Sequence, residues 1–373
     1  MASMIRRRLF AVFVLGFFVF FGFAWPAAEL PAQLSDEAFW SLVTEFSEPG
    51  GSFTSDNFVS NERTFQRVLA DLAEGRKGQG AYLGVGPEQN FTYIAALKPR
   101  IAFILDIRRQ NLIQHLMYKA LFELSADRAD FLSRLFSRPK PVDPGKDFGA
   151  TALFEGFRGA AADAKMHDEN LQAIKNRLVK DHGFTLTADD ERVLEYVFGA
   201  FYTFGPNLTY NGALVNRLMP TYEGVMTESD NQGEQRSYLA TEENFLTLQQ
   251  FEKKNLLVPL VGDFAGPKAL QSVGRYLKEH NTALTAFYTS NVEQYLFWRN
   301  SDSWKPFYAN VATLPVNASS VFIRFNTDMG ANPEPTMSTI SRPVTLLCSV
   351  PALVAAFEAG NVGSYFDVFQ ACR

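Results

Sequence analysis

The chain has 373 residues, of which 47% are hydrophobic and 20% are charged, so its composition is that of a folded globular protein rather than a disordered chain. It carries 35 basic and 40 acidic residues, a formal net charge of -5, and no long basic run in its body. These features give little support to a nucleic-acid-binding surface. Small molecules or proteins are the expected partners.

The N-terminus indicates export. Three arginines at positions 6 to 8 precede an uncharged apolar run that ends at Trp25. This arrangement is typical of a signal peptide, and the run is also almost as long as the roughly 20 residues that span a bilayer. We therefore assign residues 1–28 to a signal peptide or, if uncleaved, an N-terminal membrane anchor. The body, residues 29–373, is expected outside the cytoplasm, periplasmic or membrane-anchored.

Six short apolar runs in the body predict buried strands. They lie at 81–85, 101–105, 256–261, 283–288, 321–325 and 344–348. Helical patterns separate them, so the predicted fold class is α/β. We expect a Rossmann-like, mostly parallel sheet with helices on both faces and the first strand in its middle.

Two segments lie outside this alternation. Residues 30–75 predict two helices around a loop rich in glycine and serine. Residues 125–240 form a long helical insertion after the second strand, with helices near 127–137, 161–181 and 188–204. The single domain over residues 29–373 is therefore expected to carry a helical cap.

The stretch AYLGVGPEQN contains the clearest site signal. Gly84 and Gly86 follow a predicted strand, and such a turn lets the backbone approach a ligand at the start of the next helix. Asp106 lies 22 residues beyond Gly84 at the end of the next strand, where a carboxylate commonly binds ribose hydroxyls. The alternative is an ordinary turn, with Asp106 capping a helix.

Glu88 bears on the choice of ligand. A carboxylate in the first helical turn would repel a pyrophosphate but attract an ammonium group. A ligand that carries adenosine and a positive charge, such as S-adenosylmethionine, fits Glu88 and Asp106 together. The alternative is that Glu88 complements the helix dipole.

The glycine turn at Gly84 and Gly86 together with Asp106 resembles the class I methyltransferase-like branch of the Rossmann folds. The segments SEPGGSFTSDNFVSNE, YLGVGPEQNFTYIAALKPRIAFILDIRRQN and FYTSNVEQYL are similar to an uncharacterised bacterial family of such domains. The resemblance covers roughly residues 80–124 and 255–330. It implies S-adenosylmethionine as the cofactor, bound by Gly84, Gly86, Glu88 and Asp106, with Asp263 at the adenine.

The same resemblance places a substrate at the end of the fourth strand. Thr289, Ser290 and Asn291 stand there and are assigned to ligand orientation, although Ser290 or Asn291 could instead cap the helix that begins near Val292. The sequence departs from the methyltransferase pattern at Tyr82, where an acidic residue is usual. Glu88 also stands where the motif has its last glycine.

Three functions remain open from the sequence. The first is a methyltransferase-like transferase that binds an adenosyl-type small molecule. The second is a non-catalytic exported binding or interaction protein that keeps the fold, which export favours because adenosylmethionine is a cytoplasmic cofactor. A nicotinamide dinucleotide enzyme is a third, with Arg108 or Arg109 for a 2'-phosphate and Glu88 against it.

Cysteines and histidines offer no metal site. The four histidines do not fall into a ligand spacing, and there is no CxxC pair. Cys348 and Cys372 could form a disulfide in an oxidising compartment. Equally, Cys348 could be a small buried hydrophobic residue and Cys372 a residue of a frayed tail.

Overall fold

A computed structural model describes residues 29–141, 148–212, 219–298, 301–326 and 344–372. The predicted signal or anchor, residues 1–28, lies outside the described residues. Six strands form one sheet in the order β3-β2-β1-β4-β5-β6. They are β1 (Ala81–Gly84), β2 (Ile101–Asp106), β3 (Leu257–Val261), β4 (Leu284–Ser290), β5 (Val316–Asn326) and β6 (Val344–Ser349).

The sheet confirms the predicted α/β class. Strands β1 to β5 run parallel, with β1 in the middle between β2 and β4, whereas β6 pairs antiparallel with β5. All residues of β1, β2 and β3 are buried. Strands covered on both faces need apolar side chains throughout, which is why they stand out in the sequence as continuous apolar runs.

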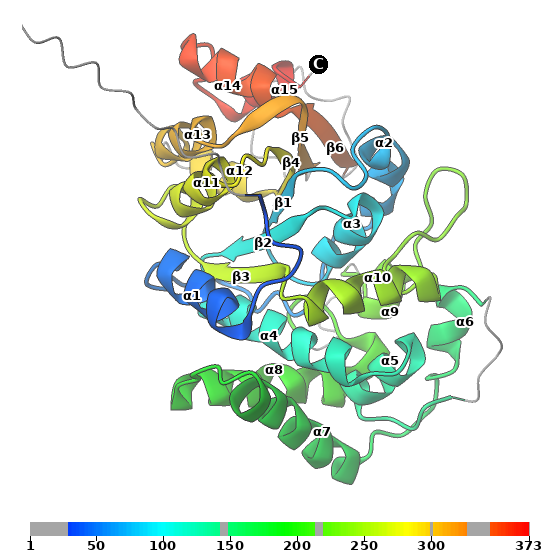
Figure 1. The fold of residues 1–373 in the computed structure, drawn as a ribbon. Helices are drawn as coiled ribbons and strands as arrows, with labels where there is room; N and C mark the ends of the chain where they lie inside the picture. The colour runs from blue at the N-terminus through cyan, green and yellow to red at the C-terminus, as the bar shows by residue number, and fades with distance from the viewer. Residues whose placement is uncertain (1–28, 142–147, 213–218, 299–300, 327–343, 373) are drawn as a thin grey trace, which may run out of the picture.

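Helices cover both faces of the sheet (Figure 1). Helices α1, α11 and α13 lie on one face, and α2, α3 and α10 lie on the other. The helices before the insertion are α1 (Asp36–Phe46), η1 (Phe65–Val68, 3-10), α2 (Leu69–Ala73), α3 (Gln89–Leu97) and α4 (Arg109–Leu124). Those after it are α10 (Glu242–Lys253), α11 (Ala269–Glu279), α12 (Val292–Phe297), α13 (Trp304–Ala312), α14 (Val350–Glu358) and α15 (Tyr365–Gln370).

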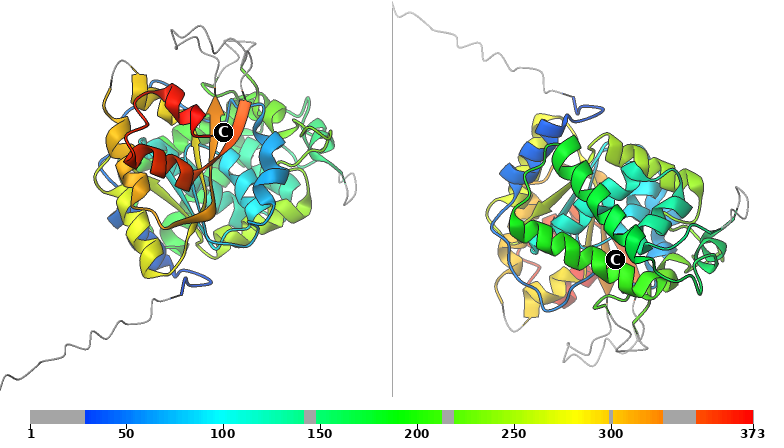
Figure 2. Two further views of the ribbon diagram at one scale, coloured as in Figure 1. Left: turned by 90° about the horizontal axis from the view of Figure 1, so that it is seen from above. Right: turned by 90° about the horizontal axis from the view of Figure 1, so that it is seen from below.

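The insertion forms a helical layer that packs on α4. Its helices are α5 (Arg128–Phe136), α6 (Ala150–Glu155), α7 (Ala164–Asn176), η2 (Arg177–Asp181, π), α8 (Ala188–Phe204), η3 (Gly205–Asn207, 3-10) and α9 (Tyr222–Met226). Figure 2 shows α7 and α8, in green, at the end of the molecule seen from below.

Helix α8 begins where the sequence predicts, because Thr187 and Asp190 form a reciprocal capping box. Asp190 also accepts from Arg109 of α4, with Arg109 Nη2 2.8 Å from Asp190 Oδ2. One carboxylate thus both starts α8 and joins the insertion to α4.

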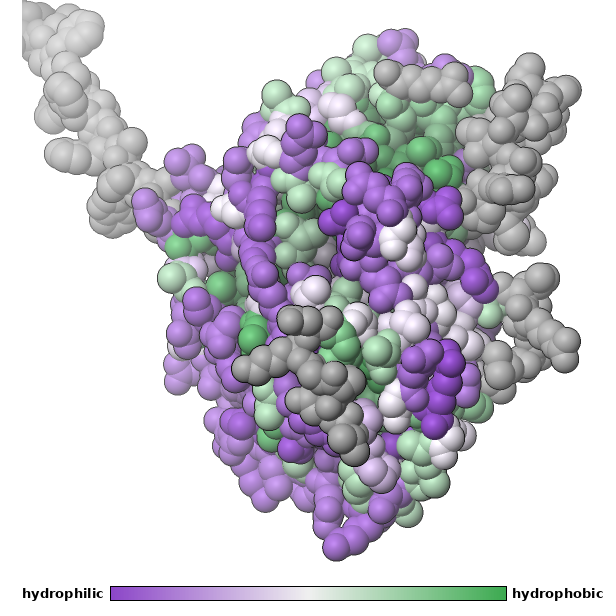
Figure 3. All heavy atoms as spheres, turned by 90° about the vertical axis from the view of Figure 1, so that its right-hand side faces the viewer, coloured by the Kyte–Doolittle hydropathy of each residue, from purple (hydrophilic) through white to green (hydrophobic). Residues whose placement is uncertain are grey.

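The C-terminal region closes the other end of the molecule, where α14 and α15 are seen from above (Figure 2). A disulfide joins Cys348 of β6 to Cys372, so the structure pairs the two cysteines. On the face in Figure 3, hydrophilic residues dominate and hydrophobic ones gather toward the top. Among the described residues, no helix combines the length and hydrophobicity needed to cross a membrane.

Candidate functional site

Ligands of open parallel sheets bind outside the carboxyl ends of the strands, so the candidate site is the edge where β1 to β4 end. Every predicted site residue lies at this edge: Gly84, Gly86, Glu88, Asp106, Asp263, Thr289, Ser290 and Asn291. The sequence therefore predicted correctly that these residues lie at the carboxyl edge of the sheet. The structure shows which contacts each of their side chains makes there.

The turn after β1 is filled by the side chain of Asn90. Its Nδ2 donates to the carbonyl oxygens of Val85 and Pro87, at 2.9 and 2.7 Å, and its Oδ1 accepts from Tyr82 Oη at 2.8 Å. A Cβ added to Gly84 would lie 1.9 Å from Asn90 Oδ1. Gly84 is thus required for the close approach of Asn90.

Glu88 is enclosed by protein, although it precedes α3 as predicted. The backbone N–H of Ser60 donates to its Oε1 at 3.1 Å, and its Oε2 has no hydrogen-bond partner among the described residues. Burial raises the pKa of Glu88 to about 8. The carboxyl group is therefore mostly protonated at pH 7, and it presents no exposed negative charge.

Asp106 is bound on both oxygens by a residue of its own strand end. Arg108 Nε lies 3.1 Å from Asp106 Oδ1 and Arg108 Nη2 lies 3.0 Å from Oδ2, and both side chains are buried. The backbone N–H of Arg108 also donates to Oδ1, at 2.9 Å. Helix α4 has Arg108, and not Asp106, at its N-cap position. Both carboxylate oxygens of Asp106 thus already accept hydrogen bonds from Arg108, at the place where a ribose hydroxyl was expected to donate.

Residues 47–62, which we call the edge segment, run along the carboxyl edge from β3 toward β4. The backbone N–H of Glu48 donates to Val261 O at 2.8 Å, and that of Gly51 donates to Ile107 O at 2.7 Å. Arg108 Nη1 then donates to the carbonyl oxygens of Ser55 and Asp56, at 3.0 and 2.6 Å.

The end of β3 is closed by Glu48 of the edge segment. Glu48 Oε1 accepts from the backbone N–H groups of Lys268 and Ala269, at 2.8 and 2.7 Å. A carboxylate at the start of α11 satisfies N–H groups that a helix leaves free and complements its dipole. Asp263, the residue predicted to contact adenine, accepts from the backbone N–H of Ala265 at 2.9 Å and is half-buried.

The end of β4 is closed by Glu62, at the other end of the edge segment. The buried Glu62 accepts from Tyr288 Oη and Gln89 Nε2, each at 2.7 Å, and from Ser290 Oγ. Burial raises the pKa of Glu62, against these hydrogen bonds. Ser290 has φ of 50°, a conformation that a residue with a side chain rarely adopts outside functional or tightly held positions.

The remaining residues of the fourth strand end have different surroundings. Thr289 is buried and its Oγ1 donates to Glu293 Oε2 at 3.3 Å, whereas Ser290 and Asn291 are half-buried. Asn291 occupies the N-cap position of α12 but makes no side-chain capping hydrogen bond. The capping alternative is therefore wrong for α12.

Sequence reasoning missed three of the residues that close the edge, Glu48, Glu62 and Asn90, and it considered Arg108 only as a partner for a 2'-phosphate. Glu48 and Glu62 lie within the stretch SEPGGSFTSDNFVSNE that carries the resemblance, so a signal was present. Glu62 contacts Tyr288 of β4 and Glu48 contacts Ala269 of α11, each more than 200 residues away, and no local pattern reveals such partners.

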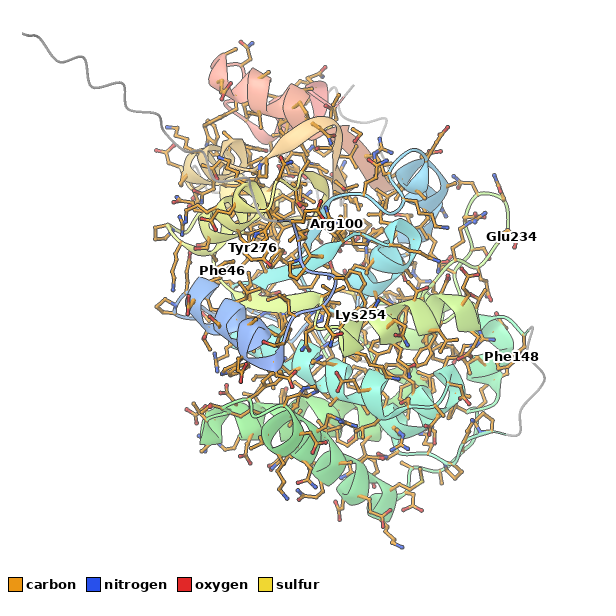
Figure 4. The ribbon with its side chains drawn as sticks, in the orientation of Figure 1. Phe46, Arg100, Phe148, Glu234, Lys254 and Tyr276 are labelled. Carbon is orange, nitrogen blue, oxygen red and sulfur yellow. A yellow bond between two sulfur atoms is a disulfide. The ribbon has the colours of Figure 1, made fainter. Side chains whose placement is uncertain are left out.

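A surface groove of about 440 Å³ lies at the opposite edge of the sheet. Its lining includes Arg100, just before β2, and Lys254, just before β3. Figure 4 shows both beside the N-terminal segment that leads into α1. No predicted site residue lines this groove. The described residues also hold no group of three or more His, Cys, Asp or Glu suited to a metal ion.

A family model described as "Domain of unknown function (DUF7790)" matches residues 57–142 and 164–339, more than two thirds of the chain. The matched ranges include the end of the edge segment and all the predicted site residues. None of the curated proteins matches the sequence.

Proposed function

We propose that this chain, which belongs to the family described as "Domain of unknown function (DUF7790)", is an exported binding protein that keeps the class I methyltransferase-like fold without methyltransferase activity. The observation that carries the proposal is the closed edge. The chain's own groups contact the places where the resemblance to methyltransferases implies a nucleoside: Asn90 at the first turn, Arg108 on Asp106, and Glu48 at the start of α11.

The strand order supports the fold part of this proposal. In a doubly wound sheet the order reverses at the first strand, as it does here between β2 and β4 on either side of β1. An antiparallel strand at the edge of an otherwise parallel sheet is common in such folds and is here β6.

Export is supported by the arginines and apolar run before residue 29 and by the disulfide between Cys348 and Cys372. Disulfides persist in oxidising compartments such as the periplasm. Alkaline phosphatase, which needs such a compartment, should be active when it is fused to the C-terminus of the full-length chain. Activity of a cytoplasm-only reporter at that position, with an inactive phosphatase fusion, would contradict export.

A transferase that binds an adenosyl-type ligand is the second candidate. It is favoured by Asp263, Ser290 and Asn291, which are half-buried at the carboxyl edge and could meet a ligand without disruption of the edge segment. Binding of adenosylmethionine separates the two candidates.

The full-length protein should show no change in melting temperature with millimolar S-adenosylmethionine, S-adenosylhomocysteine, NAD or NADP. A ligand at 100 times its Kd would stabilise the fold by about 2.7 kcal/mol, an effect that thermal unfolding detects readily. Titration calorimetry should likewise show no heat of binding. An Asp263→Ala variant is the matched control. Saturable binding to the wild type that is lost in this variant would contradict the proposal and establish the second candidate.

A further inference from the structure

Two buried polar side chains on one face of α4 lack hydrogen-bond partners for some of their polar atoms. Asn111 and His115 are one helical turn apart and are 2% and 1% exposed. Neither Oδ1 nor Nδ2 of Asn111, nor Nδ1 of His115, has a partner among the described residues. Buried polar groups are almost always hydrogen-bonded, so these atoms require an explanation.

This face of α4 packs against the turn after β1 and the edge segment. His115 Nε2 lies 2.9 Å from Gly86 O, and Gln114 Nε2 donates to Phe58 O at 2.7 Å. Gly86 has φ of 78° and is buried, yet a Cβ built on it would meet no heavy atom within 4 Å. Open space therefore borders the turn that His115 contacts.

We propose that Asn111 and His115 bind a small uncharged ligand that presents N–H or O–H donors, as amides and hydroxyl compounds do. The proposal rests on the proposed function, since it gives the binding protein its ligand class. The proposed ligand site lies on α4, the helix that follows β2, and does not include the side chains of Asp106 or Asp263.

The ligand class follows from the hydrogen-bonding groups that the site offers. Burial lowers the pKa of His115 to about 4, so its imidazole is neutral. Because Nε2–H donates to Gly86 O, Nδ1 carries a lone pair and accepts. Asn111 adds one acceptor and one NH₂ donor. The nearby Asp106 carboxylate is bound by Arg108 and the buried carboxyl group of Glu88, whose pKa is raised to about 8, is mostly protonated at pH 7, so a buried charged ligand group would find no free opposite charge.

A first experiment asks whether Asn111 is kept for a ligand or for the fold. Asn111→Leu should raise the melting temperature of the ligand-free protein by about 2 °C, because it replaces an unpartnered buried amide by an apolar group of similar size. Gln114→Leu, on the same helix face, is the matched control and should lower it, since Phe58 O loses its donor. A lower melting temperature for Asn111→Leu would show that its amide is satisfied and would overturn the proposal.

A second experiment tests the ligand class with matched pairs of compounds: nicotinamide and nicotinate, glucose and glucuronate, adenosine and AMP. At least one uncharged member should raise the melting temperature of the wild type but not that of Asn111→Leu, and its charged partner should raise neither. No effect of any uncharged member, or an equal effect of the charged partner, would overturn the ligand class. Binding of S-adenosylmethionine would instead contradict the proposed function. The melting temperatures of the wild type and of Asn111→Leu could still be compared in that case.

Discussion

Arg324→Met is expected to lower the free energy of unfolding by about 4 kcal/mol, because it leaves a buried carboxylate without its cation. Arg324 on β5 is 0% exposed and Glu293 on α12 is 1% exposed. Arg324 Nη2 lies 3.0 Å from Glu293 Oε1, and Nε contacts Oε2. Tyr308 Oη also donates to Glu293, so the carboxylate is held in place after the cation is removed.

Urea unfolding of the variant and the wild type measures this loss. Lys165→Met is the matched control, since the pair of Lys165 with Glu169 is largely exposed and should contribute less than about 0.5 kcal/mol. The double variant Arg324→Met with Glu293→Leu should be more stable than Arg324→Met alone, because no unpaired charge remains. A loss for Arg324→Met as small as that of Lys165→Met would show that the pair is not desolvated in solution.

Glu88→Gln is expected to make the protein more stable than the wild type by about 3 kcal/mol at pH 7, with no difference near pH 4. Burial raises the pKa of Glu88 from 4.5 to about 8, so the folded state favours the protonated form. The stability that this group contributes is fully present below pH 4.5 and is lost progressively as the pH rises toward 8. A glutamine keeps the acceptor for Ser60 N–H and cannot ionise.

Urea unfolding between pH 4 and 9 checks this expectation through the difference between the two curves. Burial also raises the pKa of Glu252 to about 8, but Glu252 is present in both proteins and cancels in that difference. Glu37→Gln, at an exposed position of α1, should follow the wild-type curve. Parallel curves for Glu88→Gln and the wild type would show that Glu88 is solvated and ionised in the folded protein.

The sequence by itself located the six strands and predicted a mostly parallel sheet with the first strand in its middle. Strands buried on both faces need apolar side chains at every position, so β1, β2 and β3 in particular were recognised from their own residues. The start of α8 also depends on a local pattern, because the two residues of its capping box, Thr187 and Asp190, are three positions apart. Boundaries were less well determined. Strand β5 begins at Val316, five residues before the apolar run, and its first four residues are exposed or only partly buried, so they need not be apolar. The antiparallel direction of β6 was not predicted either.

Only the tertiary structure decided what the carboxyl edge does. Glu62 and Tyr288 are 226 residues apart, and Glu48 and Ala269 are 221 apart, so their hydrogen bonds leave no periodic trace in the sequence. Asp106 was interpreted as a ligand-binding carboxylate from its distance after Gly84 and its place at a strand end, and Glu88 from its place in the first helical turn. Whether a carboxylate is free depends on burial and on its partners, here Ser60 for Glu88 and Arg108 for Asp106. Burial and the contact of Ser60 with Glu88 arise only when separate segments pack together, so no local residue pattern carries them. Arg108 is two residues from Asp106, but only the folded backbone turns its guanidinium onto that carboxylate.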